Sequence, residues 1–130
     1  MKKTTDAACP CGSGQTYAQC CGRYHAGAAA PDAAHLMRSR YSAYVRGLSD
    51  YLRATWHPDT CPADIGLDAL PRPQWLGLDV KSHAEQDAAH ATVEFVARYK
   101  LNGRAFRLHE TSRFVRIDGR WFYLDGDVRE

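Results

Sequence analysis

Residues 91–125 have the sequence ATVEFVARYKLNGRAFRLHETSRFVRIDGRWFYLD, and this stretch decides the fold of the chain. Apolar and polar residues alternate along it, which is the pattern of half-buried β-strands. Asn102-Gly103 and Asp118-Gly119 interrupt the alternation, and both dipeptides favour the two-residue type I′ turn of a tight hairpin. The preceding run WLGLDVKSHA (75–84) has the same alternation. These segments predict an antiparallel meander of four strands.

The first turn fixes the register of the first tight hairpin. A two-residue loop at 102–103 places Leu101 opposite Arg104 and Phe95 opposite Glu110. Because side chains alternate between the two faces of a sheet, a slip of one residue would exchange the faces. The register therefore predicts which side chains share the core with Phe95.

The second turn, at 118–119, places Phe114 opposite Tyr123 and Ser112 opposite Asp125. Together the two turns predict one apolar face and one mostly polar face. The predicted apolar face carries Val93, Phe95, Ala97, Tyr99, Leu101, Phe106, Leu108, Phe114, Trp121 and Tyr123.

Glu110 and Asp125 are the two carboxylates on the predicted apolar face. A carboxylate among aromatic side chains must be paired, hydrogen-bonded or protonated. The favoured interpretation is a buried ion pair between Glu110 and Arg40, with Asp125 at the rim. The alternative is a small pocket enzyme in which Glu110 or Asp125 acts as general base. Hydrogen-bond donors to developing negative charge would then come from Tyr41, Tyr44 or His57.

The segment before the strands predicts helices. Apolar residues recur at helical spacing over residues 33–47, and Asp32 is the expected N-cap. Ser49 is expected to cap a short helix at 50–56, and residues 61–71 are expected to form a third. Helices followed by a meander indicate an α+β fold, with the helices packed on one face of a curved sheet.

Near the N-terminus, the sequence CPCGSGQTYAQCC contains Cys9, Cys11, Cys20 and Cys21. Four thiolates at this spacing suit one tetrahedral Zn²⁺ ion in a closed, structural site. His25 is the alternative fourth ligand if Cys21 points away. Reduced free thiols or a redox couple are the other interpretations of the cluster.

Composition sets the class of protein. The chain has 130 residues, of which 45% are hydrophobic and 25% charged, and its net charge is +2. The composition is ordinary for a soluble globular protein, and the net charge is too small to argue by itself for a polyanionic partner. No apolar run is long enough for a membrane span, and the N-terminus lacks the apolar region of a secretory signal. A cytoplasmic location is therefore expected.

The expected organisation has four parts: a disordered tail (1–8), a metal-binding segment (9–25), a linker (26–31) and a body (32–130). Arg98, Arg107 and Arg113 are predicted to project from the polar face of the body and could meet phosphates. A solvated face with local ion pairs is favoured over nucleic-acid binding, because Glu94 shares this face and base-stacking aromatics are not evident there.

The cysteine segment resembles the SEC-C motif at the C-terminal end of the SecA translocation ATPase. In SecA this motif engages the export chaperone SecB and is linked to ribosomes, so the resemblance implies a protein partner of that class. Most of the remaining chain resembles the uncharacterised YchJ-like family of bacterial proteins. The resemblance rests on GRYH (22–25), LMRSRYSAY (36–44), TWHP (55–58), VEFVARY (93–99), LHETSRF (108–114) and GRWFYLDG (119–126).

The YchJ-like resemblance implies an N-terminal SEC-C motif joined to an NTF2-like domain, a cone of helices around a curved sheet. It implies no particular biochemical activity, because folds of this class serve both as enzymes and as binding or dimerisation modules. The expected function is that of a zinc-binding adaptor whose SEC-C motif docks a protein. The body would supply a pocket or a homodimer surface.

Overall fold

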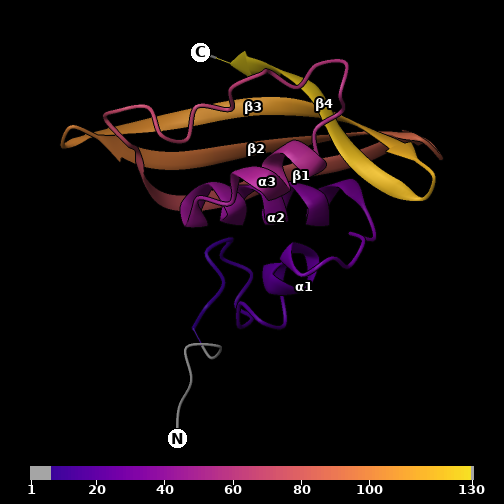
Figure 1. Ribbon diagram of the computed structural model, residues 1–130, viewed down its shortest axis with the longest axis horizontal. Helices are drawn as coiled ribbons and strands as arrows, with labels where there is room; N and C mark the ends of the chain where they lie inside the picture. The colour runs from indigo at the N-terminus through magenta and orange to yellow at the C-terminus, as the bar shows by residue number, and fades with distance from the viewer. Residues whose placement is uncertain (1–6, 130) are drawn as a thin grey trace, which may run out of the picture.

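The computed structural model describes residues 7–129 as a curved sheet covered on one face by helices (Figure 1). The sheet contains four antiparallel strands in the order β1-β2-β3-β4. This arrangement confirms the predicted meander. The strands are β1 (Gln74–Asp87), β2 (His90–Leu101), β3 (Arg104–Ile117) and β4 (Arg120–Arg129).

Both predicted hairpin turns are present. Asn102 and Asp118 have φ values of 53° and 52°, and the glycine after each has a φ of 80°. Two consecutive residues with positive φ are the signature of the type I′ turn. The first turn sets Leu101 opposite Arg104 and, further along, Phe95 opposite Glu110, as predicted.

The predicted register of the second hairpin is only partly right. Phe114 lies opposite Tyr123, but Ser112 faces Gly126 and not Asp125. The cause is a bulge, in which Leu124 is an extra residue on β4 between two consecutive pairs. An extra residue exchanges the faces of everything beyond it, so Asp125 does not lie on the apolar face.

Helix α2 (Ala33–Arg46) matches the prediction closely. The Asp32 carboxylate accepts a hydrogen bond of 2.8 Å from the His35 backbone N–H, as an N-cap should. The helix ends at Gly47, whose φ of 74° is the left-handed conformation that favours glycine.

The prediction for residues 49–71 is less accurate. Helix α3 (Ser49–Ala54) begins one residue earlier than expected, with Leu48 and not Ser49 at the N-cap. The third helix expected over 61–71 does not form. Instead, the Arg53 guanidinium donates to the backbone carbonyls of Pro62 and Ala63 at 3.2 and 2.9 Å. A side chain thus satisfies carbonyl groups that a helix would have satisfied internally.

Helix α2 lies between the sheet and the cysteine segment, which ends in the short helix α1 (Cys21–His25) (Figure 1). The four cysteines belong to the same buried cluster as Leu36 and Met37 of α2 and Val93 of the sheet. The cysteine segment therefore shares one core with the body. The tail expected over residues 1–8 falls largely outside the described residues. Ala7 and Ala8 pair with the cysteine segment at Tyr17 and Thr16.

Within residues 7–129, no helix has the length and apolar character needed to cross a membrane.

Candidate metal centre and sheet cavity

The four predicted cysteine ligands converge on one point. Their Sγ atoms all lie within 4.8 Å of one another, and all four residues are buried. The Sγ atoms of Cys11 and Cys20 are 3.6 Å apart. A Zn–S bond of about 2.3 Å in a tetrahedral site requires sulfur atoms about 3.8 Å apart. The cluster therefore has the dimensions of a four-thiolate metal site.

The electrostatics of the cluster also suit a cation. A hydrogen bond from Cys21 is the largest influence on Cys11 and lowers the pKa of its thiol. The same bond, followed by burial, raises the pKa of Cys21, and burial raises the pKa of Cys20. A divalent metal ion would favour ionisation of all four thiols, because metal ligands must be deprotonated. The hydroxyl of Ser13, 3.2 Å from the Sγ of Cys20, can donate to that sulfur.

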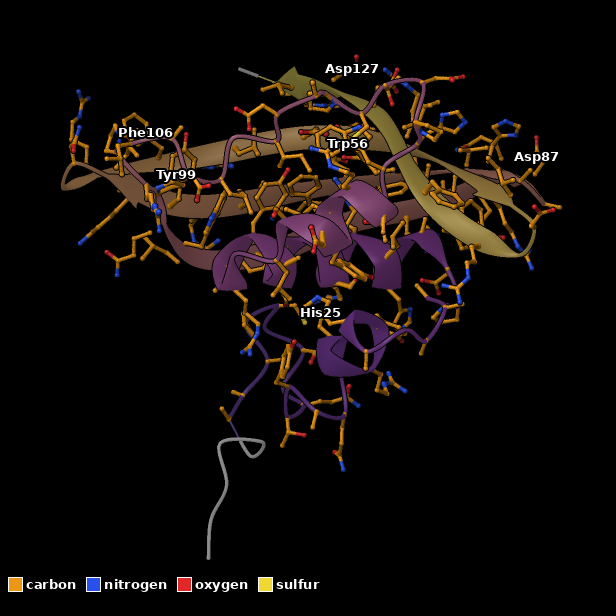
Figure 2. All side chains as sticks on the ribbon, in the orientation of Figure 1. His25, Trp56, Asp87, Tyr99, Phe106 and Asp127 are labelled. Atoms are coloured by element: carbon orange, nitrogen blue, oxygen red, sulfur yellow. The ribbon has the colours of Figure 1, made fainter. Side chains whose placement is uncertain are left out.

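His25 lies outside the cluster, and the condition for its use as a ligand is not met, because Cys21 points inward with the other cysteines. Its Nε2 is 2.8 Å from the backbone carbonyl of Ser39, so this nitrogen must carry the proton and donate. Its Nδ1 therefore accepts from the hydroxyl of Tyr17 at 2.6 Å. Both ring nitrogens are occupied, and the side chain connects the cysteine segment to α2 (Figure 2).

A second feature is a cavity of about 230 Å³ between α2 and the sheet. Half of the residues in its wall are aromatic, and the charged groups are few. Arg40 approaches it from α2, and Glu110 and Ser112 approach it from β3. The residues that line it are Met37, Arg40, Tyr41, Tyr44, Trp56, Trp75, Phe95, Ala97, Leu108, Glu110, Ser112 and Tyr123.

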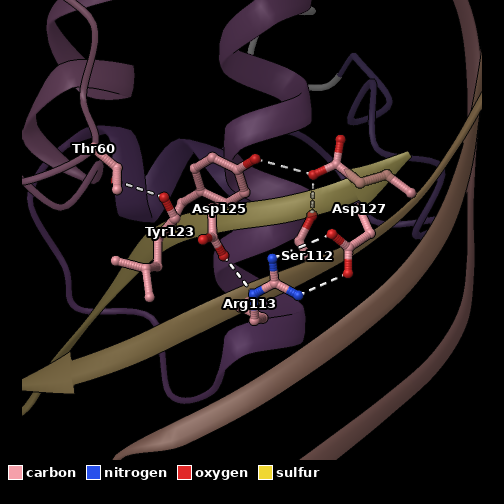
Figure 3. A network of polar contacts seen from close by, with 8 residues as sticks. Thr60, Ser112, Arg113, Tyr123, Asp125 and Asp127 are labelled. Atoms are coloured by element: carbon pink, nitrogen blue, oxygen red, sulfur yellow. Dashed lines mark hydrogen bonds and ion pairs between the residues drawn. The ribbon is translucent and has the colours of Figure 1, made fainter.

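The predicted ion pair between Arg40 and Glu110 does not form. Glu110 accepts hydrogen bonds from the hydroxyls of Ser112 and Tyr123, at 2.7 and 3.0 Å (Figure 3). Arg40 donates instead to the carbonyl of Leu52 at 2.9 Å and to the Thr55 hydroxyl at 2.7 Å. The sequence did not reveal this, because both acceptors lie in or directly after α3, whose packing against α2 is a tertiary feature.

Asp125, the second predicted candidate for general base, lies away from the cavity. The bulge in β4 turns it toward Arg113, whose Nε donates to it at 2.5 Å (Figure 3). Asp127 accepts from the same guanidinium at 2.8 Å. The two carboxylates neutralise this arginine, and their hydrogen bonds raise its pKa.

Of the three predicted hydrogen-bond donors, two line the cavity and one does not. Tyr41 and Tyr44 line the cavity, and burial raises the pKa of both phenols. His57 does not line it. Its Nδ1 accepts from the backbone N–H of Asp59 at 3.0 Å, within the turn after α3.

The polar face of the sheet carries local ion pairs, as the sequence favoured. Arg98 lies opposite Arg107. The Nε2 of His109 is 2.7 Å from the Glu94 carboxylate, and Arg113 is held by the two aspartates of β4.

Trp56 and Trp75 are cavity residues that the sequence did not identify. Trp56 is the second residue after α3, and Trp75 is the second residue of β1, so neither belongs to a periodic apolar face. The only signal was the presence of large aromatic residues at element boundaries.

Comparison with known proteins agrees with this geometry. Residues 7–23 match the SEC-C motif, and residues 32–126 match the middle NTF2-like domain of YchJ. The chain belongs to the YchJ-like family. The NTF2-like fold expected from the sequence is therefore confirmed, together with the N-terminal SEC-C motif.

The chain is similar to two relatives along nearly its whole length. The chain is 62% identical to a UPF0225 protein of Ralstonia nicotianae, over 94% of this chain and 92% of that protein. It is also 62% identical to a UPF0225 protein of Cupriavidus metallidurans, over 98% and 93% of the two chains.

Two solved structures of SEC-C motif containing proteins have the same fold. The solution structure of the protein from Rhodopseudomonas palustris has a TM-score of 0.83 at 35% identity and covers 94% of this chain and 98% of that chain. The crystal structure of the protein from Psychrobacter arcticus has a TM-score of 0.83 at 31% identity and covers 98% and 85% of the two chains.

Proposed function

We propose that this chain is a cytoplasmic zinc-binding protein whose cysteine segment docks a protein partner while the NTF2-like body holds that segment in place. The observation that carries the proposal is the closed set of four buried Sγ atoms within 4.8 Å of one another. Four protein ligands leave a zinc ion no open position for a substrate, so its role is structural. A metal ion at this point would fix the conformation of a segment that has little core of its own.

The outer side of the cysteine segment supports docking. Gly12, Ser13, Gly14 and Gln15 are exposed between the two cysteine pairs, and so are Ala18 and Gln19. The cysteine segment as a whole lies beyond α2, on the side of that helix away from the sheet (Figure 1). The resemblance to the SEC-C motif of SecA favours a partner of the export-chaperone or ribosome-associated class.

The first experiment is the metal content of the purified protein by native mass spectrometry. We expect one zinc ion per chain, and we expect the ion to be lost from a Cys11→Ser, Cys20→Ser double variant. A chain that binds no zinc would contradict the proposed ligand set, as would a double variant that still binds one zinc ion.

The second experiment measures docking itself. Binding to purified ribosomes is followed by co-sedimentation, and binding to a SecB-type chaperone by calorimetry. We expect one of these partners to bind the metal-loaded chain. A Gln15→Glu, Gln19→Glu variant should keep its zinc ion and bind at least tenfold more weakly, because both exposed side chains would become anionic. Binding to neither partner would contradict the docking role, and so would equal binding by this variant.

A further inference from the structure

Arg40 is a buried cation without an ionic partner. It is only 3% exposed. None of the ion pairs found among residues 7–129 includes it. Its hydrogen bonds go to two neutral groups, the Leu52 carbonyl and the Thr55 hydroxyl. Buried charges in proteins are normally paired, because an unpaired charge is costly to remove from water. An arginine cannot avoid this cost by losing its proton.

Trp56 adds a second donor beside Arg40. Its indole N–H is buried and has no acceptor among residues 7–129. The guanidinium carbon of Arg40 lies 4.9 Å from the centre of the Trp56 ring, and both residues line the cavity. Buried donors without an acceptor are rare in folded proteins. Arg40 and Trp56, which both line the cavity, thus carry an unpaired charge and an unsatisfied N–H that an acceptor on a ligand would satisfy.

Glu110 gives the cavity a second polar region. Tyr123 separates the two, because its ring faces the Arg40 guanidinium, 4.7 Å away, while its hydroxyl donates to the Glu110 carboxylate. Burial and the nearby Glu110 raise the pKa of Tyr123, so its hydroxyl keeps the proton that it donates. The cavity therefore has a cationic region and an anionic region with aromatic walls between them.

We propose that this cavity binds a small aromatic carboxylate. The carboxylate would accept from Arg40 and from the indole N–H of Trp56, as charge-assisted hydrogen bonds require. The ring would lie among the aromatic side chains, and a hydroxyl or amino substituent would donate to Glu110. The volume of about 230 Å³ suits a single-ring compound, since pockets for larger ligands exceed about 300 Å³.

An aromatic cavity with a carboxylate also invites comparison with sites for quaternary ammonium ions. Two observations disfavour such a ligand here. Arg40 already lies over the rings of both Trp56 and Tyr123. Its positive charge would also repel a second cation. The carboxylate is therefore the better complement to this wall.

The test uses the full-length, zinc-loaded protein labelled with ¹⁵N and titrated with 4-hydroxybenzoate. The chain has three tryptophans, so its spectrum contains three indole N–H signals, and a Trp56→Phe variant assigns one of them. We expect saturable binding with the largest downfield shift at the Trp56 indole N–H. The methyl ester, which lacks the anionic charge, should bind at least tenfold more weakly.

Variants test each contact. Trp56→Phe should weaken binding about 2- to 10-fold, as expected for the loss of one hydrogen bond. Glu110→Gln should bind benzoate at least as well as the parent does, while losing any preference for 4-hydroxybenzoate. Arg113→Met, on the opposite face of the sheet, should bind normally. The comparison of acid and ester tests the role of the ligand's negative charge without replacing Arg40, because an Arg40 variant can fail to fold.

Three results would overturn the proposal. The first is the absence of a saturable shift at Trp56 at millimolar ligand. The second is equal binding of acid and ester. The third is tighter binding of benzyltrimethylammonium than of 4-hydroxybenzoate.

Discussion

Replacement of His25 by alanine should destabilise the whole protein and leave the proposed metal site intact. The imidazole makes two hydrogen bonds, one to the Tyr17 hydroxyl at 2.6 Å and one to the Ser39 carbonyl at 2.8 Å. It also packs edge-on against Tyr51, with ring centres 4.6 Å apart. Each hydrogen bond contributes about 0.5–1.5 kcal/mol and the ring pair a similar amount. The expected loss in the free energy of unfolding is therefore about 2–4 kcal/mol.

The assay is urea unfolding of the protein in buffer that contains zinc, followed by tryptophan fluorescence, which reports on the body. We expect His25→Ala to lower the midpoint of a single transition, because the cysteine segment and the body share one core. His35→Ala is the matched control. His35 is 48% exposed, and among the described residues its ring contacts the Asp32 carboxylate and the edge of the Tyr24 ring, with ring centres 6.3 Å apart. Because these contacts are exposed or distant, this variant should lose less than about 1 kcal/mol.

Zinc content provides the second measurement for the same variant. Because both nitrogens of His25 are occupied by Tyr17 and Ser39, His25→Ala should still bind one zinc ion. Loss of the metal ion would show that His25 is a ligand and would refute the assignment. A loss of stability below about 0.5 kcal/mol would refute the connecting role.

Three further predictions concern pH, the β4 bulge and the polar face. Burial lowers the pKa of His25 from its ordinary value of 6.5, so the unfolded chain binds its proton at higher pH than the folded protein does. Stability should fall as the pH drops below about 6.5, and urea midpoints measured across pH should show a smaller fall in His25→Ala. Gly126→Ala should lower the free energy of unfolding by about 1–3 kcal/mol, because the new Cβ would collide with the Glu110 carboxylate. In a double-mutant cycle, Gly126→Ala should lower the free energy of unfolding less in the Glu110→Ala variant than in the parent protein. An equal loss in the two proteins would exclude the collision. Arg113→Ala should lower the free energy of unfolding, measured by thermal unfolding, by at most about 1 kcal/mol, since the Arg113 side chain is 42% exposed. A larger, salt-independent loss would show that the pair with Asp125 and Asp127 is more than a surface contact.

Local chemistry made the sheet predictable. A type I′ turn requires positive φ at two successive residues, and Asn-Gly and Asp-Gly are among the few dipeptides that adopt it readily. The turn at 102–103 determined the pairing of β2 with β3, including Phe95 opposite Glu110, without any tertiary information. The prediction was wrong at Asp125, because a bulge has no comparable local signal. Gly126 could have hinted at one, since a glycine within a strand often marks a bulge or a close approach.

The cavity could not be predicted in the same way. Arg40 and Glu110 were expected to pair because they are oppositely charged and both belong to inward-facing positions. Their actual partners depend on where α3 and β4 lie relative to α2. The Leu52 carbonyl and the Thr55 hydroxyl receive the guanidinium, while Ser112 and Tyr123 provide hydroxyls to the carboxylate.

The sequence by itself determined the elements that depend on neighbours along the chain: the meander, the Asp32 cap of α2 and the spacing of the four cysteines. Each is set by backbone conformation or ligand chemistry within a few residues. Only the tertiary structure decided that α2 lies between the sheet and the cysteine segment. On one side of α2, His25 is hydrogen-bonded to the Ser39 carbonyl, and on the other side Arg40 lines the cavity. These outcomes depend on packing between segments far apart in the chain, where oppositely charged residues that face the same core need not meet.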